Sequence, residues 1–172
     1  MTKKYGIIGN PIKHSLSPIL HNYWFEKYKI DASYSIIEIE KSELPKLISR
    51  IKNKDIIGIN ITLPYKQKIV PHIDLLINDA EITSSVNTVF LDDKGTIVGE
   101  NTDVFGLQAA YLKEVDNISR RNALVIGAGG VSPSVILSLE KCGVKNISIT
   151  NRTEDKCIFL KKKFKFLNIV NW

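Results

Sequence analysis

The chain has 172 residues, of which 44% are hydrophobic and 24% charged, values ordinary for a soluble globular protein of one domain or two small ones. The net charge of +6 comes without a basic stretch interleaved with aromatic residues, which argues against a nucleic-acid partner and favours an anionic substrate or cofactor. No apolar run approaches the ~18 residues that span a membrane, so we expect neither a membrane partner nor export. Cys142 and Cys157 lack metal-ligand spacing, so we expect two free thiols in the cytoplasm and no metal.

The first part of the chain predicts alternating strands and helices. A buried strand is expected over residues 5–9, and Ser17 is expected to cap a helix that has Pro18 at its first position. Residues 33–39 alternate between apolar and polar, as a strand does. Ser42 with Pro45 should open a second helix, whose apolar side chains recur at helical spacing: Leu44, Leu47, Ile48 and Ile51.

Residues 58–66 read Gly-Ile-Asn-Ile-Thr-Leu-Pro-Tyr-Lys and predict a strand that stops at Pro64, which cannot donate to a β-ladder. Near its end lie Asn60, Thr62 and Lys66. Ligands of open α/β sheets bind beyond the carboxyl ends of the strands, so Lys66 is a candidate proton donor. The alternative is a core strand followed by a solvated lysine.

The next elements are shorter. We expect a helical stretch over 68–77, a turn of helix over 79–83, and a hairpin that joins 86–91 to 96–98 through Asp-Asp-Lys-Gly. A helix over 104–115 is expected to connect two domains, with the boundary near residues 101 to 104.

The last part predicts a βαβ unit. A strand of the fully buried type is expected over 123–127, followed by a helix to about Cys142 and a strand over 146–150. A lysine-rich helix over 155–164 and a strand near 168–170 follow. Strands that alternate with helices indicate an α/β protein with mostly parallel sheets.

The glycine-rich turn between the first strand and helix of this unit has the context of a dinucleotide-binding fingerprint. Gly127 would allow the tight turn, Gly129 would let the backbone approach a pyrophosphate, and the helix N-terminus would favour its negative charge. Ser132 takes the third fingerprint position. We therefore expect residues Gly127, Ala128, Gly129, Gly130 and Val131 to bind a nucleotide.

The following strand ends at Asn151, Arg152 and Thr153, where an NAD site typically has a carboxylate for the ribose 2′-hydroxyl. A guanidinium instead pairs with a 2′-phosphate, which a carboxylate would repel. These residues favour NADP as the cofactor. The alternative is that Arg152 is a surface arginine at the start of a helix.

Two further polar clusters, 84–88 and 101–103, lie in loops of the first half. Together with the polar residues around Lys66 and with Ser15 and Ser17, they would suit a small polyhydroxylated ligand. Each residue alone also has a structural explanation: Asn87 could hold a turn, and Asp103 could cap the next helix.

Taken in order, these motifs resemble the shikimate dehydrogenase family over essentially the whole chain. The matching segments are Gly9–Pro11, His14–Pro18 with His21 and Asn22, Asn60–Thr62 with Pro64 and Lys66, Val86–Thr88, Gly99–Asp103, Gly127–Gly130 and Asn151–Thr153.

The resemblance implies a three-layer α/β substrate domain with a mostly parallel sheet over residues 1–102, and the first half of a Rossmann NADP-binding domain over 103–172. It implies NADPH-dependent reduction of 3-dehydroshikimate to shikimate, a step towards aromatic amino acids. Lys66 and Asp103 would form the acid–base pair, and Asn151, Arg152 and Thr153 would hold the 2′-phosphate end of the cofactor. The substrate would contact Ser15, Ser17, Asn60, Thr62, Asn87 and Asp103.

The family's chain is longer, and a C-terminal segment there completes the cofactor domain and returns to the substrate domain. We therefore expect a truncated piece of a longer enzyme, monomeric or homodimeric and weakly active by itself. Two alternatives stay open: a quinate/shikimate dehydrogenase, and a catalytically incomplete fragment that binds substrate or nucleotide.

Overall fold

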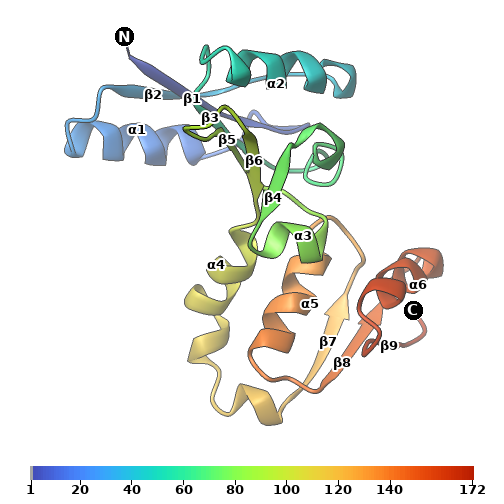
Figure 1. Cartoon of the computed structure of the whole chain (residues 1–172). Coiled ribbons are helices and arrows are strands. Elements are labelled where there is room, and N and C mark those ends of the chain that lie inside the picture. The colour runs from blue at the N-terminus through green and yellow to red at the C-terminus, as the bar shows by residue number, and fades with distance from the viewer. Residues whose placement is uncertain (1) are drawn as a thin grey trace. The chain divides into compact units, whose positions relative to one another are not determined.

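The computed structural model describes residues 2–172, and its contacts divide the chain into two compact units (Figure 1). The first unit runs to Asn101, and the second extends from Thr102 to Trp172. Each unit is an α/β structure with its own sheet and its own hydrophobic core.

The first unit contains a six-stranded sheet in the order β2-β1-β3-β5-β6-β4. Strand β1 is parallel to both β2 and β3, and β4 is parallel to β6, whereas β5 is antiparallel to its neighbours β3 and β6. Most strand pairs are therefore parallel, as the sequence predicts. The strands are β1 (Lys3–Ile8), β2 (Ala32–Ile36), β3 (Gly58–Ile61), β4 (Leu75–Ile77), β5 (Thr88–Leu91) and β6 (Ile97–Glu100).

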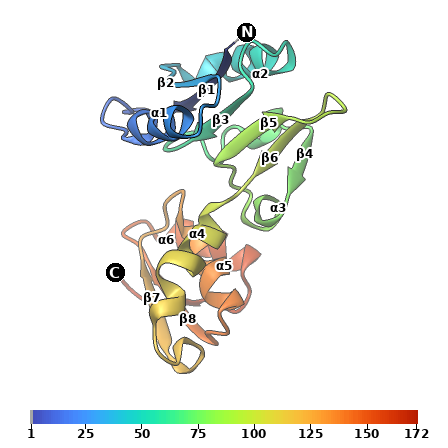
Figure 2. The same ribbon diagram turned by 90° about the vertical axis from the view of Figure 1, so that its left-hand side faces the viewer.

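Two helices cover opposite faces of this sheet, α1 (Ser17–Lys27) and α2 (Leu44–Lys52) (Figures 1 and 2). Successive side chains of a strand point to opposite faces. Accordingly, Ile8 belongs to the main core with the apolar face of α2, whereas Ile7 belongs to a smaller cluster with Phe25 of α1. This arrangement gives the expected three layers. The four predicted apolar residues of α2, Leu44, Leu47, Ile48 and Ile51, are all buried.

The predicted helix starts need correction. The residue before α1 is Leu16, and Ser17 is already helical, so Ser17 does not cap the helix. Its N–H instead donates to Oγ of Ser15 at 3.3 Å. Ser42 lies in a short 3-10 turn, η1 (Lys41–Glu43), which precedes α2.

The prediction of a helical stretch over 68–77 is wrong for its second half. A 3-10 turn, η2 (Val70–His72), is followed by strand β4, and α3 (Asp79–Thr83) follows where the turn of helix was predicted. Asp74 explains the strand: its N–H donates to the carbonyl of Ile97 at 3.0 Å, and its Oδ2 accepts the N–H of Ile97 at 2.9 Å. The predicted hairpin of β5 and β6 is confirmed.

The second unit starts with α4 (Asp103–Ala110), which packs on α5 (Ser132–Lys141). The predicted helix over 104–115 is shorter than expected, because two 3-10 turns follow α4, η3 (Leu112–Glu114) and η4 (Ile118–Arg120). The parallel sheet β7-β8-β9 confirms the predicted βαβ unit. Its remaining elements are β7 (Asn122–Ile126), β8 (Asn146–Thr150), α6 (Glu154–Lys163) and β9 (Asn168–Ile169).

Strand β7 is not fully buried, contrary to the prediction. Val125 lies in the core with α5, but Leu124 is 55% exposed and Ile126 71% exposed. The reason is that successive side chains of β7 alternate between the two faces of the sheet: Val125 points into this core, whereas Leu124 and Ile126 point to the opposite face. Among the helices of residues 2–172, none is both long enough and apolar enough to cross a membrane.

Candidate functional site

The carboxyl end of β3 brings Asn60 against the start of β5. Asn60 is the register partner of Thr88 in this antiparallel pair. Its Nδ2 donates to the backbone carbonyl of Asn87 at 3.3 Å and to Oγ1 of Thr88 at 3.2 Å. Two of the predicted substrate residues, Asn60 and Asn87, are therefore in direct contact.

Asn60 has a third partner that the sequence analysis missed. Tyr34 lies in strand β2, and its hydroxyl donates a hydrogen bond to Oδ1 of Asn60 at 2.7 Å. Burial raises the pKa of Tyr34 to about 12. Asn60 and Tyr34 line a cavity of about 250 Å³ together with the aromatic rings of Tyr5, His21 and Phe25.

The turn after β3 ties Thr62 and Lys66 to the same end of the sheet. The N–H of Thr62 donates to the carbonyl of Ile8 at 2.9 Å, and the N–H of Val86 donates to the carbonyl of Lys66 at 2.8 Å. Because Val86 directly precedes Asn87, the backbone of Lys66 lies beside the Asn60–Asn87 contact. Lys66 itself is half-buried.

The loop after β1 lies against this turn. A Cβ atom added to Gly9 would lie 2.5 Å from Cγ2 of Thr62, which is too close for a non-bonded contact. The close approach of this loop to the turn therefore requires glycine at residue 9. The same loop leads to Ser15 and Ser17, the predicted binders of a substrate carboxylate. The N–H of Asn10 also donates to the carbonyl of Leu63 at 2.9 Å.

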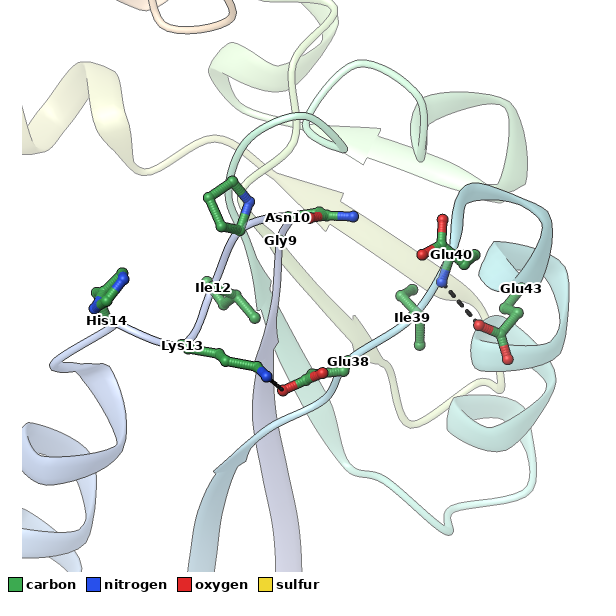
Figure 3. A pocket seen from close by; sticks show the side chains of 10 residues that line it. Gly9, Asn10, Ile12, Lys13, His14, Glu38, Ile39, Glu40 and Glu43 are labelled. Carbon is green, nitrogen blue, oxygen red and sulfur yellow. Dashed lines mark hydrogen bonds and ion pairs between the residues drawn. The ribbon is translucent and has the colours of Figure 1, made fainter.

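A cavity of about 380 Å³ lies beyond the ends of β1 and β2 (Figure 3). Nζ of Lys13 lies 3.9 Å from Oε1 of Glu38, which forms an ion pair between two residues that line the cavity. Oε2 of Glu43 accepts a hydrogen bond from the N–H of Glu40 at 2.8 Å. The predicted substrate residues are not among those that line it, which are Gly9, Asn10, Pro11, Ile12, Lys13, His14, Glu38, Ile39, Glu40 and Glu43.

Asp103, the predicted partner of Lys66, is the first residue of α4 and so belongs to the second unit. Lys66 belongs to the first unit. The pairing of the two side chains stays a prediction.

In the second unit, the glycine turn has the backbone that its sequence predicts. Gly127 has a φ of +104°, which residues with a side chain rarely adopt, and its N–H donates to the carbonyl of Thr150 at 2.8 Å. A Cβ added to Gly129 would meet no atom within 4 Å, so the turn is open on that side. This geometry fits the close approach of a phosphate to the backbone.

Ser132 and Asn151 hold the turn in place. Oγ of Ser132 accepts the N–H of Gly129 at 2.9 Å and donates to the carbonyl of Gly127 at 2.9 Å. Asn151 accepts the N–H of Ala128 at 3.1 Å and donates to the carbonyl of Thr153 at 2.8 Å. Asn151 thus links the glycine turn to the loop after β8.

Arg152 lines a cavity of about 220 Å³ at the end of β8, together with Asn151. A guanidinium at this position fits the 2′-phosphate of NADP. The other residues that line this cavity lie on α6, in β9 or after β9, and no sequence motif marks them: Glu154, Cys157, Ile169, Val170, Asn171 and Trp172.

Two family models match successive parts of the chain. The model of the shikimate dehydrogenase substrate binding domain matches residues 7–89, and the model of shikimate / quinate 5-dehydrogenase matches residues 109–171. Over 172 residues, the chain is 46% identical to the shikimate dehydrogenase (NADP(+)) of Pelagibacter ubique, and the match covers 100% of this chain and 64% of that relative.

Solved structures have the same fold. The crystal structure of shikimate dehydrogenase from Aquifex aeolicus matches with a TM-score of 0.91 and 38% identity, over 99% of this chain and 63% of that one. Shikimate 5-dehydrogenase from Listeria monocytogenes, in complex with shikimate and NAD, matches with a TM-score of 0.87 and 31% identity, over 99% of this chain and 61% of that one. The chain therefore spans less than two thirds of the length of these relatives.

Proposed function

This chain belongs to the shikimate dehydrogenase family, and from this membership we propose that it carries the substrate site and part of the cofactor site of an NADP-dependent shikimate dehydrogenase. The reaction is the reduction of 3-dehydroshikimate to shikimate. The observation that carries the proposal is the 46% identity over 172 residues to a relative that bears this name. The sites of the two units each support one half of it.

The substrate half rests on the polar residues at the carboxyl end of the first sheet. We propose that Asn60, Thr62, Asn87 and Asp103 bind the ring oxygens of the substrate. Its carboxylate would be bound by Ser15 and Ser17. The direct contact between Asn60 and Asn87, at 3.3 Å from Nδ2 to the carbonyl, supports a shared role for these two residues. Hydroxyl and amide groups match the hydroxyls of a small polyol.

The cofactor half rests on the glycine turn and Arg152. Residues 127–131 would hold the pyrophosphate at the start of α5, and Asn151, Arg152 and Thr153 would hold the 2′-phosphate end. When bound, NADPH supplies the hydride. The guanidinium of Arg152 favours the phosphorylated cofactor over NAD, which is the cofactor present in the Listeria structure.

Lys66 is the proposed acid. Reduction of a ketone builds negative charge on its oxygen, and an ammonium group stabilises that charge and donates the proton. Asp103 would orient the Lys66 ammonium towards this oxygen. In the reverse direction Lys66 takes the proton back from the hydroxyl of shikimate.

The direct test is NADPH consumption by the 172-residue chain with 3-dehydroshikimate. The proposal expects consumption that depends on the substrate, and the same chain should oxidise shikimate when given NADP⁺. Binding of shikimate and NADPH without hydride transfer would favour the alternative of a catalytically incomplete fragment that binds substrate or nucleotide.

A second alternative is a dehydrogenase that also uses quinate, which the description of the model matching residues 109–171 supports. Parallel assays with shikimate and quinate separate the two. Turnover of shikimate with no quinate oxidation supports the narrower activity, and comparable rates with both favour the broader one.

A further inference from the structure

The side-chain amide of Asn60 is held in one orientation by partners on both sides. The carbonyl of Asn87 can only accept a hydrogen bond, so the NH₂ group of Asn60 must face it, at 3.3 Å. The carboxamide oxygen then points to the Tyr34 hydroxyl, which donates to it at 2.7 Å. A reversed amide would place two acceptor oxygens against each other at Asn87.

Tyr34 is itself fixed at its backbone and at its ring. Asn22 of α1 forms two hydrogen bonds with it, from Nδ2 to the Tyr34 carbonyl at 2.8 Å and from the Tyr34 N–H to Oδ1 at 2.9 Å. The ring of His21 stacks on the Tyr34 ring, with centroids 4.2 Å apart and an interplanar angle of 6°. Tyr34 is 5% exposed. Its hydroxyl is therefore a rigid donor.

The Tyr34 hydroxyl keeps its proton at all ordinary pH values, because burial raises its pKa to about 12. With NH₂ engaged by Asn87 and Thr88, what Asn60 can offer a ligand is the second lone pair of Oδ1. That lone pair accepts from a hydroxyl and repels a carboxylate or a ketone oxygen.

We propose that Tyr34 is a positioning residue of the substrate site, which acts through Asn60 by fixing its carboxamide so that Oδ1 accepts a hydrogen bond from a substrate hydroxyl. This inference rests on the proposed function, because it takes Asn60 as a substrate-binding residue. It assigns a role to the pair His21–Asn22 as well: they hold Tyr34 at its ring and its backbone.

The test uses Tyr34→Phe, which removes the hydroxyl and keeps the ring that stacks on His21. Loss of one hydrogen bond should weaken shikimate binding by about 2- to 10-fold in a calorimetric titration of the 172-residue chain. Tyr5→Phe is the matched control, since Tyr5 lines the same cavity and its ring packs on Phe25. We expect it to keep the wild-type affinity.

A double-mutant cycle separates a role through Asn60 from a general loss of structure. In an Asn60→Ala background, Tyr34→Phe should cause no further loss of shikimate affinity. If Tyr34→Phe lowers the shikimate affinity equally in the wild-type and the Asn60→Ala backgrounds, the inference is overturned. It is also overturned if Tyr5→Phe lowers the affinity as much as Tyr34→Phe does.

A second readout needs no ligand. The two side-chain N–H resonances of Asn60, assigned from their absence in Asn60→Ala, should shift in the Tyr34→Phe spectrum and stay in place in Tyr5→Phe. Unchanged Asn60 resonances in Tyr34→Phe overturn the inference. If the wild-type chain binds no shikimate, the proposed function fails. The Asn60 resonances still show whether Tyr34 fixes the orientation of the Asn60 carboxamide.

One measurement requires no variant to fold. In wild-type protein, the Tyr34 hydroxyl proton should exchange slowly with water and show a nuclear Overhauser contact to the side chain of Asn60. A hydroxyl proton that exchanges freely with water contradicts the inference.

Discussion

Lys66 is placed by its backbone, because its carbonyl accepts the N–H of Val86 at 2.8 Å. Lys66→Ala keeps this bond and removes the ammonium group. We expect kcat for 3-dehydroshikimate reduction to fall by about 10²-fold or more, with a smaller change in KM, because proton donation acts in the transition state.

The matched control is Lys68→Ala, an exposed lysine two positions further along the chain, whose ammonium lies 5.9 Å from the ring centroid of Tyr65. Its kcat should stay close to that of the wild type. Unchanged turnover in Lys66→Ala would remove this lysine from the mechanism.

Arg152 sets the choice of cofactor in the proposal. Arg152→Ala should weaken NADP⁺ binding by roughly 10- to 100-fold, because a charge-assisted bond to phosphate contributes about 1.5–3 kcal/mol. Binding of NAD⁺, which has no 2′-phosphate, should change little. Calorimetric titration with each cofactor measures the ratio, and Arg120→Ala, on the 3-10 turn η4, is the control. An equal loss for both cofactors would refute this role.

At the scale of single residues, the sequence indicates which side chains are polar and near a strand end. It does not indicate which hydrogen bonds orient them. Asn60 and Asn87 stand out because polar side chains occur there near the end of one apolar strand and at the start of the next. Tyr34 does not, because a tyrosine in an alternating strand looks like a core residue, and its hydroxyl partner is 26 positions away in the chain. Likewise, the sequence treats Asn151 as a cofactor residue alone, whereas its carboxamide also joins Ala128 to Thr153.

Helix α2 holds the three-layer unit together through one apolar face. Leu47 on that face is 2% exposed. Leu47→Ala should lower the free energy of unfolding by about 2–5 kcal/mol, from lost burial and the cavity left behind. Lys46→Ala, on the exposed side of the same helix, should change it by less than about 0.5 kcal/mol. Urea unfolding followed by circular dichroism measures both, and similar values for the two variants would contradict this packing.

Asp74 ties β4 to β6 and gives the first unit a pH dependence. Bonds from the N–H of Ile97 and the side chain of Lys52 hold the pKa of Asp74 below its ordinary value of 3.8. A carboxyl with a lowered pKa stabilises the fold above its unfolded pKa, and this contribution disappears as the pH falls through the folded pKa.

Asp74→Asn should therefore be less stable than the wild type at pH 7, and the difference should shrink as the pH falls below about 3.8. Urea unfolding at a series of pH values tests this. Asp93→Asn, in the hairpin turn between β5 and β6, is the control. A difference between Asp74→Asn and wild type that stays constant down to pH 2 would argue against this coupling.

Elements with a clear period or a turn signal were predictable, and those defined by their neighbours were not. The apolar positions of α2 and the hairpin of β5 and β6 match the prediction. Residues 75–77 are too few to show a period, and they form a strand because Asp74 pairs with Ile97. The apolar run of β7 predicts burial on both faces, yet Val125 lies in the core, whereas Ile126, whose side chain points to the other face, is 71% exposed.

At the scale of the whole molecule, both units place polar residues at the carboxyl ends of their strands. In the first unit, Asn60 lies near the carboxyl end of β3, beside Asn87 at the start of the antiparallel strand β5, and the second unit gathers the glycine turn and Arg152 beyond β7 and β8. This is the position at which α/β sheets bind ligands. We propose that the first unit recognises shikimate.

Calorimetric titration of shikimate into the 172-residue chain, with and without NADP⁺ present, tests that claim most directly. We predict saturable binding at one site per chain, weakened in Asn87→Ala and Thr62→Val. A titration that shows no saturable heat at millimolar shikimate, with a chain that circular dichroism shows to be folded, would contradict it.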